Sequence, residues 1–290
     1  IDPEKTWNVL KNFKGGNAVF TQPATPIKCG GAPQKIMYLA EHYFRKHEIR
    51  EKTNVVFAAP GGVIFGVKEF AKTLNHIIAS RNIIFKPFYA PISIDSKAKK
   101  ITFRYNTAMA GNDCMTQKNV KLHEEVQGDT EMVMPYDMLH LAPPQTAPKF
   151  IQESPLAVAE GPNKGWLEVN IHKLNHPKFL NVYGIGDSAA LPTAKTGAAI
   201  RKQAPVVVEQ IRAAEAHTTS PLEYQGYSSC PLVTGYGKML LAEFKYDNVR
   251  DSDPLISTFV DTTKESWLMW ILKKYGLPYL YWNQMLRGKM

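Results

Sequence analysis

Two cysteines lie in segments whose composition favours thiol chemistry. Cys29 follows Lys28 in the segment TPIKCGGAPQK, directly ahead of a predicted helix. A neighbouring cation and the amide groups at a helix N-terminus both favour the thiolate, which is the reactive form of cysteine. Cys230 precedes Pro231 in the segment YSSCPLVTGY, which we expect to form a loop. The residues alone leave open whether either cysteine reacts or is a small buried apolar side chain.

The remaining cysteine, Cys114, lies in a polar stretch over 107–130 that we expect to be a hairpin tip or surface excursion, and we assign it no role. Three cysteines cannot build the disulfide framework of a small secreted domain. The sequence has no CxxC motif and no cysteine–histidine cluster, so we predict no metal site. This cysteine content is typical of a reducing compartment and leaves room for one reactive pair.

A second candidate site follows a short apolar run in the string NVYGIGDSAALPTAKTG. We expect Gly186 and Asp187 to contact a flavin nucleotide at the carboxyl end of a strand, where α/β sheets bind ligands. A carboxylate accepts hydrogen bonds from the hydroxyl groups of a ribityl chain. Thr196 and Gly197 begin a predicted helix, whose first amide groups can bind an anion or a polarised ring oxygen. The alternative is that Asp187 merely caps a strand-to-helix turn.

The elements around Cys29 predict a βαβ unit. An apolar strand at 17–21 leads into the Cys29 loop, a helix follows over 32–46, and a second strand, apolar after its first residue, covers 54–58. A dinucleotide-binding unit carries a glycine-rich phosphate turn at this place, but prolines and Cys29 occupy it here. Further elements are expected as a helix over 67–81, strands at 83–89, 100–105, 132–141, 167–169 and 181–185, and a helix over 196–214.

The C-terminal stretch ESWLMWILKKYGLPYLYWNQMLRGKM combines tryptophans, tyrosines and leucines with several basic residues. We expect two short amphipathic helices here, separated by a break at 276–278, because glycine and proline end helices. Aromatic amphipathic helices of this kind lie in a membrane interface without crossing it. A helix that caps the core, or a contact between two subunits, is the alternative. No run of about 18 apolar residues predicts a spanning helix.

The composition is that of a folded protein with about two domains at roughly 150 residues each. Hydrophobic residues make up 44% of the chain and charged residues 21%, which excludes a disordered protein. The net charge is +9, which favours anionic partners such as nucleotides or acidic lipid surfaces. The basic residues are scattered and form no arginine-rich run, so we predict no binding of nucleic acid.

Three strings occur in order along the chain: TPIKCGGAPQKIMYLAEHYFRK, GIGDSAALPTAKT and YSSCPLVTGYGKMLLAEFKYD. Together with the closing LPYLYWNQMLRG, they closely resemble the mitochondrial sulfide:quinone oxidoreductase family, which is similar to the FAD-dependent pyridine nucleotide-disulfide oxidoreductases. The resemblance implies an FAD enzyme that oxidises hydrogen sulfide and passes two electrons to ubiquinone. It also implies transfer of sulfane sulfur to a small acceptor (glutathione, coenzyme A or sulfite) and a monotopic, peripheral position on the mitochondrial inner membrane.

Residue by residue, the resemblance implies that Cys29 and Cys230 are the family's redox cysteine pair, and either of them could carry the persulfide sulfur. The string that contains Gly186 and Asp187 resembles the second FAD motif of flavoproteins with two dinucleotide-binding domains. Lys195 stands where the family has a lysine near the flavin, and a cation there would stabilise the reduced ring.

The resemblance also implies two Rossmann-like, three-layer domains, the first of them incomplete, and a C-terminal helical aromatic region that faces membrane and quinone. We expect the N-terminal FAD segment to be absent, because the chain lacks a G-x-G-x-x-G fingerprint and an initial methionine, and the glycine run at 61–66 has a different spacing. The predicted boundaries are 1–14 for the end of that segment, 15–150 for the second Rossmann-like domain, 151–222 for the return of the FAD domain and 223–290 for the C-terminal region.

Two other functions stay open at this point. A nicotinamide-dependent flavoprotein dehydrogenase or disulfide reductase would carry a glycine-rich turn after the strand at 17–21, where this chain has prolines and Cys29. The other alternative is an inactive fragment that cannot hold FAD.

Overall fold

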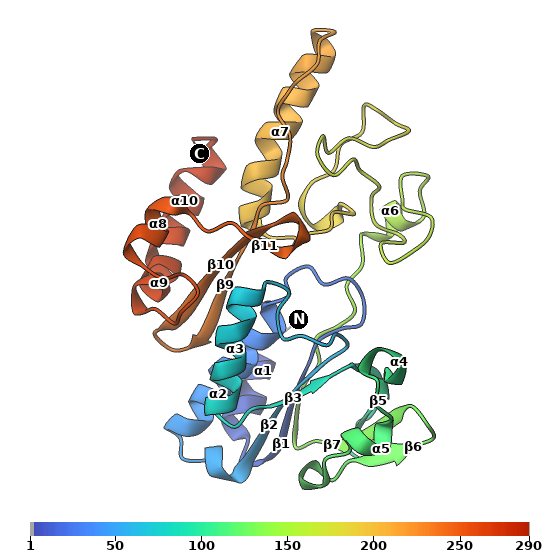
Figure 1. Ribbon diagram of the computed structural model, residues 1–290, viewed down its shortest axis with the longest axis vertical. Helices are drawn as coiled ribbons and strands as arrows, with labels where there is room; N and C mark the ends of the chain where they lie inside the picture. Colours follow the sequence, from blue (N-terminus) through green and yellow to red (C-terminus); the bar gives the residue numbers. More distant parts are fainter. Residues whose placement is uncertain (1–2, 290) are drawn as a thin grey trace.

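A four-stranded parallel sheet lies at the centre of the half of the chain that carries Cys29 (Figure 1). The computed structural model describes residues 3–289, so the first two residues of the predicted lead-in and the last residue of the C-terminal region lie outside it. The sheet has the order β3-β2-β1-β8, and all its pairs are parallel. Its strands are β1 Gly16–Thr21, β2 Thr53–Ala59, β3 Ile84–Pro87 and β8 Met138–His140.

The two central strands divide their side chains between two cores. Phe20 and Phe57 pack on one face against helices, whereas Val19 and Val56 pack on the other face against a second sheet. This alternation follows from the two-residue period of a strand and explains why both strands bury apolar side chains on both faces. The helices on the first face are α1 Pro3–Asn12, α2 Ala32–Lys46 and α3 Lys68–Ser80, of which α2 has the predicted bounds.

The second sheet is antiparallel, with the order β4-β5-β7-β6. Part of the predicted surface excursion over 107–130 is in fact ordered core, because short helices there bury Cys114 and Leu122 against this sheet. The predicted strand at 132–141 is divided between the two sheets. The elements are β4 Tyr89–Asp95, β5 Lys100–Tyr105, α4 Thr107–Ala110, α5 Cys114–Gln117, β6 Glu125–Gln127 and β7 Glu131–Pro135.

The segment over 151–222 contains one long helix and little sheet. The predicted strands at 167–169 and 181–185 are wrong, since these residues form only isolated bridges such as Leu167 with Ala189 and Asn175 with Tyr183. A strand needs a continuous partner for its backbone groups, and residues 3–289 offer none there. The predicted incomplete Rossmann-like domain therefore has no sheet of its own in the described residues, although the mixed α/β class is confirmed. Its helices are α6 Lys149–Gln152 and α7 Gly197–Glu215.

The C-terminal region is a β-hairpin followed by short helices (Figure 1). Cys230 lies in a strand and not in the predicted loop, because its backbone pairs with Ala242 across the hairpin. The predicted break at 276–278 is also wrong: the chain stays helical through a π turn, and Pro278 occupies the first turn of the next helix, where a proline is tolerated. The elements are β9 Ser228–Gly235, β10 Lys238–Lys245, β11 Val249–Arg250, α8 Pro254–Phe259, α9 Trp267–Ile271 and α10 Leu277–Asn283.

Among residues 3–289, none of the helices has both the length and the apolar character needed to cross a bilayer.

Candidate active site

The fold brings the two candidate cysteines together. Cys29 is half-buried in the loop between β1 and α2, and Cys230 is buried near the start of β9. Their sulfur atoms lie 3.1 Å apart and are not covalently bonded. Leu232, which shares a face of β9 with Cys230, packs in the same core as α2, so the contact between this helix and this strand sets the approach of the two sulfurs.

Gly31 makes this approach possible. A Cβ atom at this position would lie 2.5 Å from the sulfur of Cys230 and would also overlap the side chain of Leu232. A glycine is therefore needed here for space. Gly30, its neighbour, has nothing within 4 Å of the place where a Cβ would stand. The second glycine of the KCGG string is thus part of the cysteine site.

The surroundings of the two thiols favour opposite protonation states. A hydrogen bond with Cys230 lowers the pKa of Cys29 to about 6, with further help from Lys35 and from the amides of Gly31 and Ala32, although burial acts in the other direction. The same hydrogen bond, together with burial, raises the pKa of Cys230 well above its usual range. Near neutral pH, Cys29 is therefore the thiolate and Cys230 the thiol that donates to it.

Lys28 joins the Cys29 loop to the string that contains Asp187. Its Nζ atom lies 2.9 Å from Oδ2 of Asp187, and its carbonyl oxygen accepts a hydrogen bond of 2.6 Å from the amide of Lys195. The amide of Lys28 donates in turn to Oε1 of Gln145 at 2.5 Å. The Cys29 loop and the string that contains Asp187 and Lys195 are far apart in the sequence, and each is predicted to carry chemistry. They are in contact through Lys28 and form one side of the site, which we call the shared wall.

The predicted flavin-contacting residues lie along this wall. Gly186 has a φ of +61°, which favours glycine, and a Cβ there would stand 2.9 Å from Ile200. The carboxylate of Asp187 is 61% exposed, so it can accept hydrogen bonds from a ligand while it pairs with Lys28. Gly197 begins α7 with open space where its Cβ would be. An exposed carboxylate and an open helix N-terminus fit a flavin nucleotide, which offers hydroxyl donors and acceptor oxygens.

Thr196 and Lys195 are held by contacts that the sequence does not reveal. The hydroxyl of Thr196 caps α7 by accepting from the amide of Ala199, and it also lies 2.9 Å from the hydroxyl of Ser228 at the start of β9. The Nζ atom of Lys195 lies 4.7 Å from the ring centre of Trp166. Burial lowers the pKa of Lys195 to about 8, with Lys28 acting in the same direction and Asp187 against it.

Several residues of the site carried no recognised signal in the sequence. Gly31 is close to Cys29 in the sequence and could have been included on that ground, whereas Trp166 and Ser228 lie beside the site only because the chain folds back. Lys28, expected to favour the Cys29 thiolate, pairs with Asp187 instead, and Lys35 is the lysine that lowers the pKa of Cys29. Cys114 is buried in the second core, away from the cysteine pair. Residues 3–289 contain no group of three or more histidine, cysteine or acidic side chains that could hold a metal ion.

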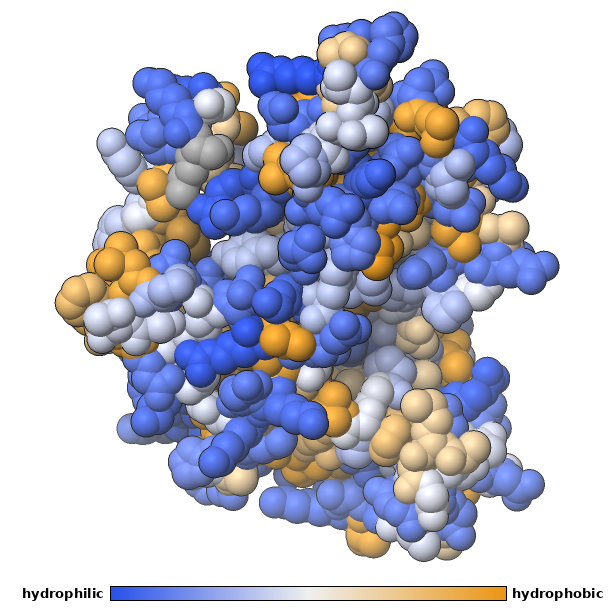
Figure 2. Space-filling model, turned by 45° about the horizontal axis from the view of Figure 1, so that its top comes forward, coloured by the Kyte–Doolittle hydropathy of each residue, from blue (hydrophilic) through white to orange (hydrophobic). Residues whose placement is uncertain are grey.

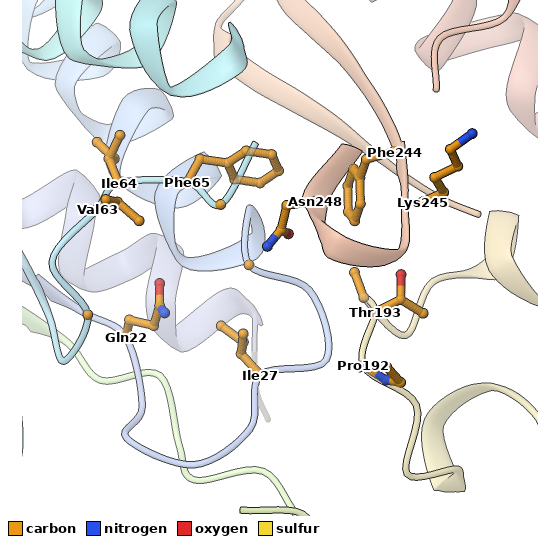
Figure 3. Close-up of a pocket in the computed structure, with 14 residues that line it drawn as sticks. Gln22, Ile27, Val63, Ile64, Phe65, Pro192, Thr193, Phe244, Lys245 and Asn248 are labelled. Atoms are coloured by element: carbon orange, nitrogen blue, oxygen red, sulfur yellow. The ribbon is translucent and has the colours of Figure 1, made fainter. Parts of the chain in front are cut away.

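A cavity of about 380 Å³ opens beside Gly30, next to Cys29 (Figure 3). The glycine run at 61–66 forms one wall, with Val63, Ile64 and Phe65, and Phe244 of β10 lies across from it. Pro192 and Thr193, from the string after Asp187, close a third side. The cavity thus lies between the thiol loop, the hairpin and the predicted flavin segment.

Comparison with known proteins shows what this chain is similar to. No protein-family model matches it. It is 41% identical to the mitochondrial sulfide:quinone oxidoreductase of mouse over 285 residues, which are 98% of the chain. It is 38% identical to the mitochondrial sulfide:quinone oxidoreductase of Dictyostelium discoideum over 288 residues, which are 99% of the chain. Nearly the whole chain is similar to these mitochondrial sulfide:quinone oxidoreductases. It spans 57% of the length of each of these two relatives.

Solved structures agree with the fold of this family. The sulfide:quinone oxidoreductase of Aquifex aeolicus matches with a TM-score of 0.69 at 16% identity, over 96% of this chain and 60% of that one. A chain in the mitochondrial ATP synthase of Tetrahymena thermophila matches with a TM-score of 0.70 at 19% identity, over 94% of this chain and 60% of that one. At these identities, the two structures support the fold alone.

Proposed function

We propose that this chain carries the cysteine pair of an FAD-dependent sulfide:quinone oxidoreductase, which oxidises hydrogen sulfide, reduces ubiquinone and passes sulfane sulfur to a small acceptor. The observation that carries the proposal is the 3.1 Å contact between the sulfurs of Cys29 and Cys230, with the low pKa of one thiol and the high pKa of the other. The names of the relatives in mouse and Dictyostelium support the choice of substrates.

The first step is attack on the oxidised pair. Hydrosulfide attacks the sulfur of Cys230 in a Cys29–Cys230 disulfide, the bond between the two cysteines breaks, and Cys29 leaves as a thiolate. Cys230 then carries the persulfide. We choose this direction because Lys35 and the amides of Gly31 and Ala32 stabilise the thiolate of Cys29, which makes it the better leaving group.

The second step removes the sulfur. A thiolate acceptor attacks the outer sulfur of the Cys230 persulfide, a persulfide of the acceptor forms, and Cys230 is released as a thiol. Two electrons and two protons must then leave the cysteine pair to restore the disulfide. Bound FAD supplies the two-electron relay from thiols to quinone. In the overall reaction, hydrogen sulfide, a thiol and a quinone are converted to a persulfide of that thiol and a quinol.

The residues along the shared wall would hold the cofactor. Asp187 would accept hydrogen bonds from ribityl hydroxyls, the N-terminus of α7 at Thr196 and Gly197 would donate to ring oxygens, and Gly186 would leave room for the close approach. Lys195 would place a cation at the ring, where it favours the reduced state. The cavity beside Gly30 adjoins the Cys29 loop, although neither sulfur lines it, and we place the approach of the small sulfur nucleophile on this side.

The C-terminal helices would attach the protein to the mitochondrial inner membrane without spanning it. Figure 2 shows hydrophobic side chains at one edge of the molecule, over these helices. Trp267 and Trp282 are 62% and 63% exposed, and Lys273 and Lys274 follow α9. Aromatic side chains flanked by lysines suit the interface of an anionic membrane, from which ubiquinone would enter.

The test is a direct assay of the full-length protein. We expect yellow protein with flavin absorbance that reduces a soluble ubiquinone analogue when sulfide and a thiol are added. NADH in place of sulfide is the matched control, because a nicotinamide-dependent dehydrogenase would use it and this protein would not. Colourless protein, or quinone reduction with NADH alone, would contradict the proposal and favour the inactive or nicotinamide-dependent alternatives.

A further inference from the structure

A second contact between α2 and β9 lies at the end remote from the two sulfurs. Gly31 and Cys230 mark the near end of the contact, whereas His42 of α2 meets Gly235 and the amide of Tyr236 at the far end. The eleven steps from Gly31 to His42 rise about 16 Å along a helix, and the five steps from Cys230 to Gly235 span about 17 Å of strand. The helix and the strand therefore run side by side in the same direction, and a constraint at the far end fixes the near end.

Arg81, directly after α3, supplies such a constraint. Its side chain is 10% exposed. Nη1 donates to the backbone oxygen of Thr234 in β9, and Nη2 lies 2.6 Å from Oε1 of Glu265, which also accepts a hydrogen bond from the hydroxyl of Thr234. Nη1 lies 3.8 Å from Oε2 of Glu41, a fully buried carboxylate of α2. One guanidinium thus touches α2, β9 and the segment before α9.

The same network indicates what loss of Arg81 would change. Glu41 would keep Arg45, at 2.7 Å, and Arg50, at 3.5 Å, so its buried charge would stay compensated. The backbone oxygen of Thr234 would lose its hydrogen-bond donor, and Glu265 would lose the buried guanidinium that pairs with it. Because Glu41 of α2 keeps its two other arginines while Thr234 of β9 loses its link to α3, the effect would fall on the position of the strand.

We propose that Arg81 is a positioning residue for the cysteine pair, which ties β9 to α2 and α3 so that the sulfur of Cys230 stays in contact with that of Cys29. The use of this positioning in sulfide oxidation rests on the proposed function. The positioning itself does not, since the geometry of the two thiols can be measured without any turnover. Arg81 touches neither sulfur.

The distance between the two sulfurs has a direct readout. The hydrogen bond from Cys230 is the largest influence that lowers the pKa of Cys29, and the charge of Lys35 in α2, which moves with Cys29, lowers it further. A shift of β9 away from α2 therefore weakens this hydrogen bond, leaves Lys35 in place and raises the pH at which Cys29 becomes a thiolate.

The experiment measures the rate of alkylation of Cys29 by iodoacetamide against pH in the reduced full-length protein, by mass spectrometry of the Cys29 peptide. We expect Arg81→Gln to raise the midpoint by about one pH unit and Arg81→Lys to restore part of the shift. Lys238→Gln is the matched control, because Lys238 also binds Glu265, at 3.3 Å, but is exposed and does not hold β9 at Thr234. It should keep the wild-type midpoint.

An unchanged midpoint in Arg81→Gln, with a lowered melting temperature, would overturn the proposal and leave Arg81 a purely structural residue. If Arg81→Gln does not fold, Glu265→Gln gives the same decision, because it removes the negative charge that pairs with Arg81 beside β9. Its midpoint should also rise, and an unchanged value would again refute the role. Failure of sulfide-dependent quinone reduction in the wild-type protein would contradict the proposed function and would not affect this result.

Discussion

The sulfurs of Cys29 and Cys230 lie 3.1 Å apart, although 201 positions separate the two residues in the chain. The contact joins a loop of the parallel-sheet half to a strand of the C-terminal hairpin. One thiol is half-buried with a lowered pKa, and the other is buried with a raised pKa. An asymmetric pair of this kind suits thiol–disulfide exchange, in which one sulfur is attacked and the other leaves.

Replacement of either cysteine by serine should abolish sulfide-dependent reduction of quinone. A hydroxyl can neither form the disulfide nor carry a persulfide, so we expect a loss of at least about 100-fold in kcat for Cys29→Ser and Cys230→Ser. The control is Cys114→Ala, which removes a thiol buried in the second core, away from the pair, and should keep most of the activity. Near-normal turnover in either serine variant would refute the cysteine mechanism.

The reactivity of reduced Cys29 should follow its low pKa. Since the thiolate is the nucleophile, the rate of alkylation of Cys29 should fall by half near pH 6 and approach a plateau above neutral pH. An ordinary cysteine would show its midpoint about two pH units higher. Cys230→Ser weakens the hydrogen bond to Cys29, so its profile should move to higher pH. A wild-type midpoint near that of an ordinary cysteine would contradict the asymmetry of the pair.

The lack of a side chain at position 31 should matter more than at position 30. The added methyl group in Gly31→Ala would stand 2.5 Å from the sulfur of Cys230, so the strand must move and the disulfide should form at least about 10-fold more slowly. Gly30→Ala meets nothing within 4 Å and serves as the control. The measurement is the rate of thiol loss when the reduced protein is oxidised. Equal rates for both variants would show that Gly31 is not needed for the approach.

Asp187 should govern retention of the flavin. Asp187→Asn keeps the shape of the side chain but removes its charge and half of its acceptor capacity, so we expect FAD to bind at least about 10-fold more weakly. Asp129→Asn, in the exposed turn between β6 and β7, is the control for loss of one negative charge. The readout is the ratio of flavin to protein absorbance after gel filtration. Full retention of FAD in Asp187→Asn would remove this residue from the cofactor site.

The exposed tryptophans of the C-terminal helices should hold the protein on lipid. Replacement of both Trp267 and Trp282 by alanine should lower the bound fraction at least about 10-fold in flotation with vesicles of phosphatidylcholine and an anionic phospholipid. Phe150→Ala is the matched control, since Phe150 is 75% exposed on α6, outside the C-terminal region. If the double variant floats as well as the wild-type protein, these helices have another partner.

Much of the local structure could be predicted from the sequence. The apolar runs at β1 and β2 and the helical pattern of α2 depend on neighbours along the chain, and they were found with nearly the bounds that were expected. The expectation failed where distant partners decide the outcome. The sequence predicts a loop at Cys230, yet β10 converts that segment to a strand, and the segments at 167–169 and 181–185 lack a continuous partner and form only isolated bridges.

The sequence by itself determined which residues are available for chemistry: a cysteine beside a lysine and ahead of a helix, a second cysteine far along the chain, and an aspartate after two glycines. Only the tertiary structure decided that the two sulfurs meet, that one thiol holds its proton while the other gives it up, and that Lys28 links Asp187 to the Cys29 loop. The physical reason is that pKa values and contacts across such separations depend on burial and on ångström-scale distances, which arise when α2 packs against β9.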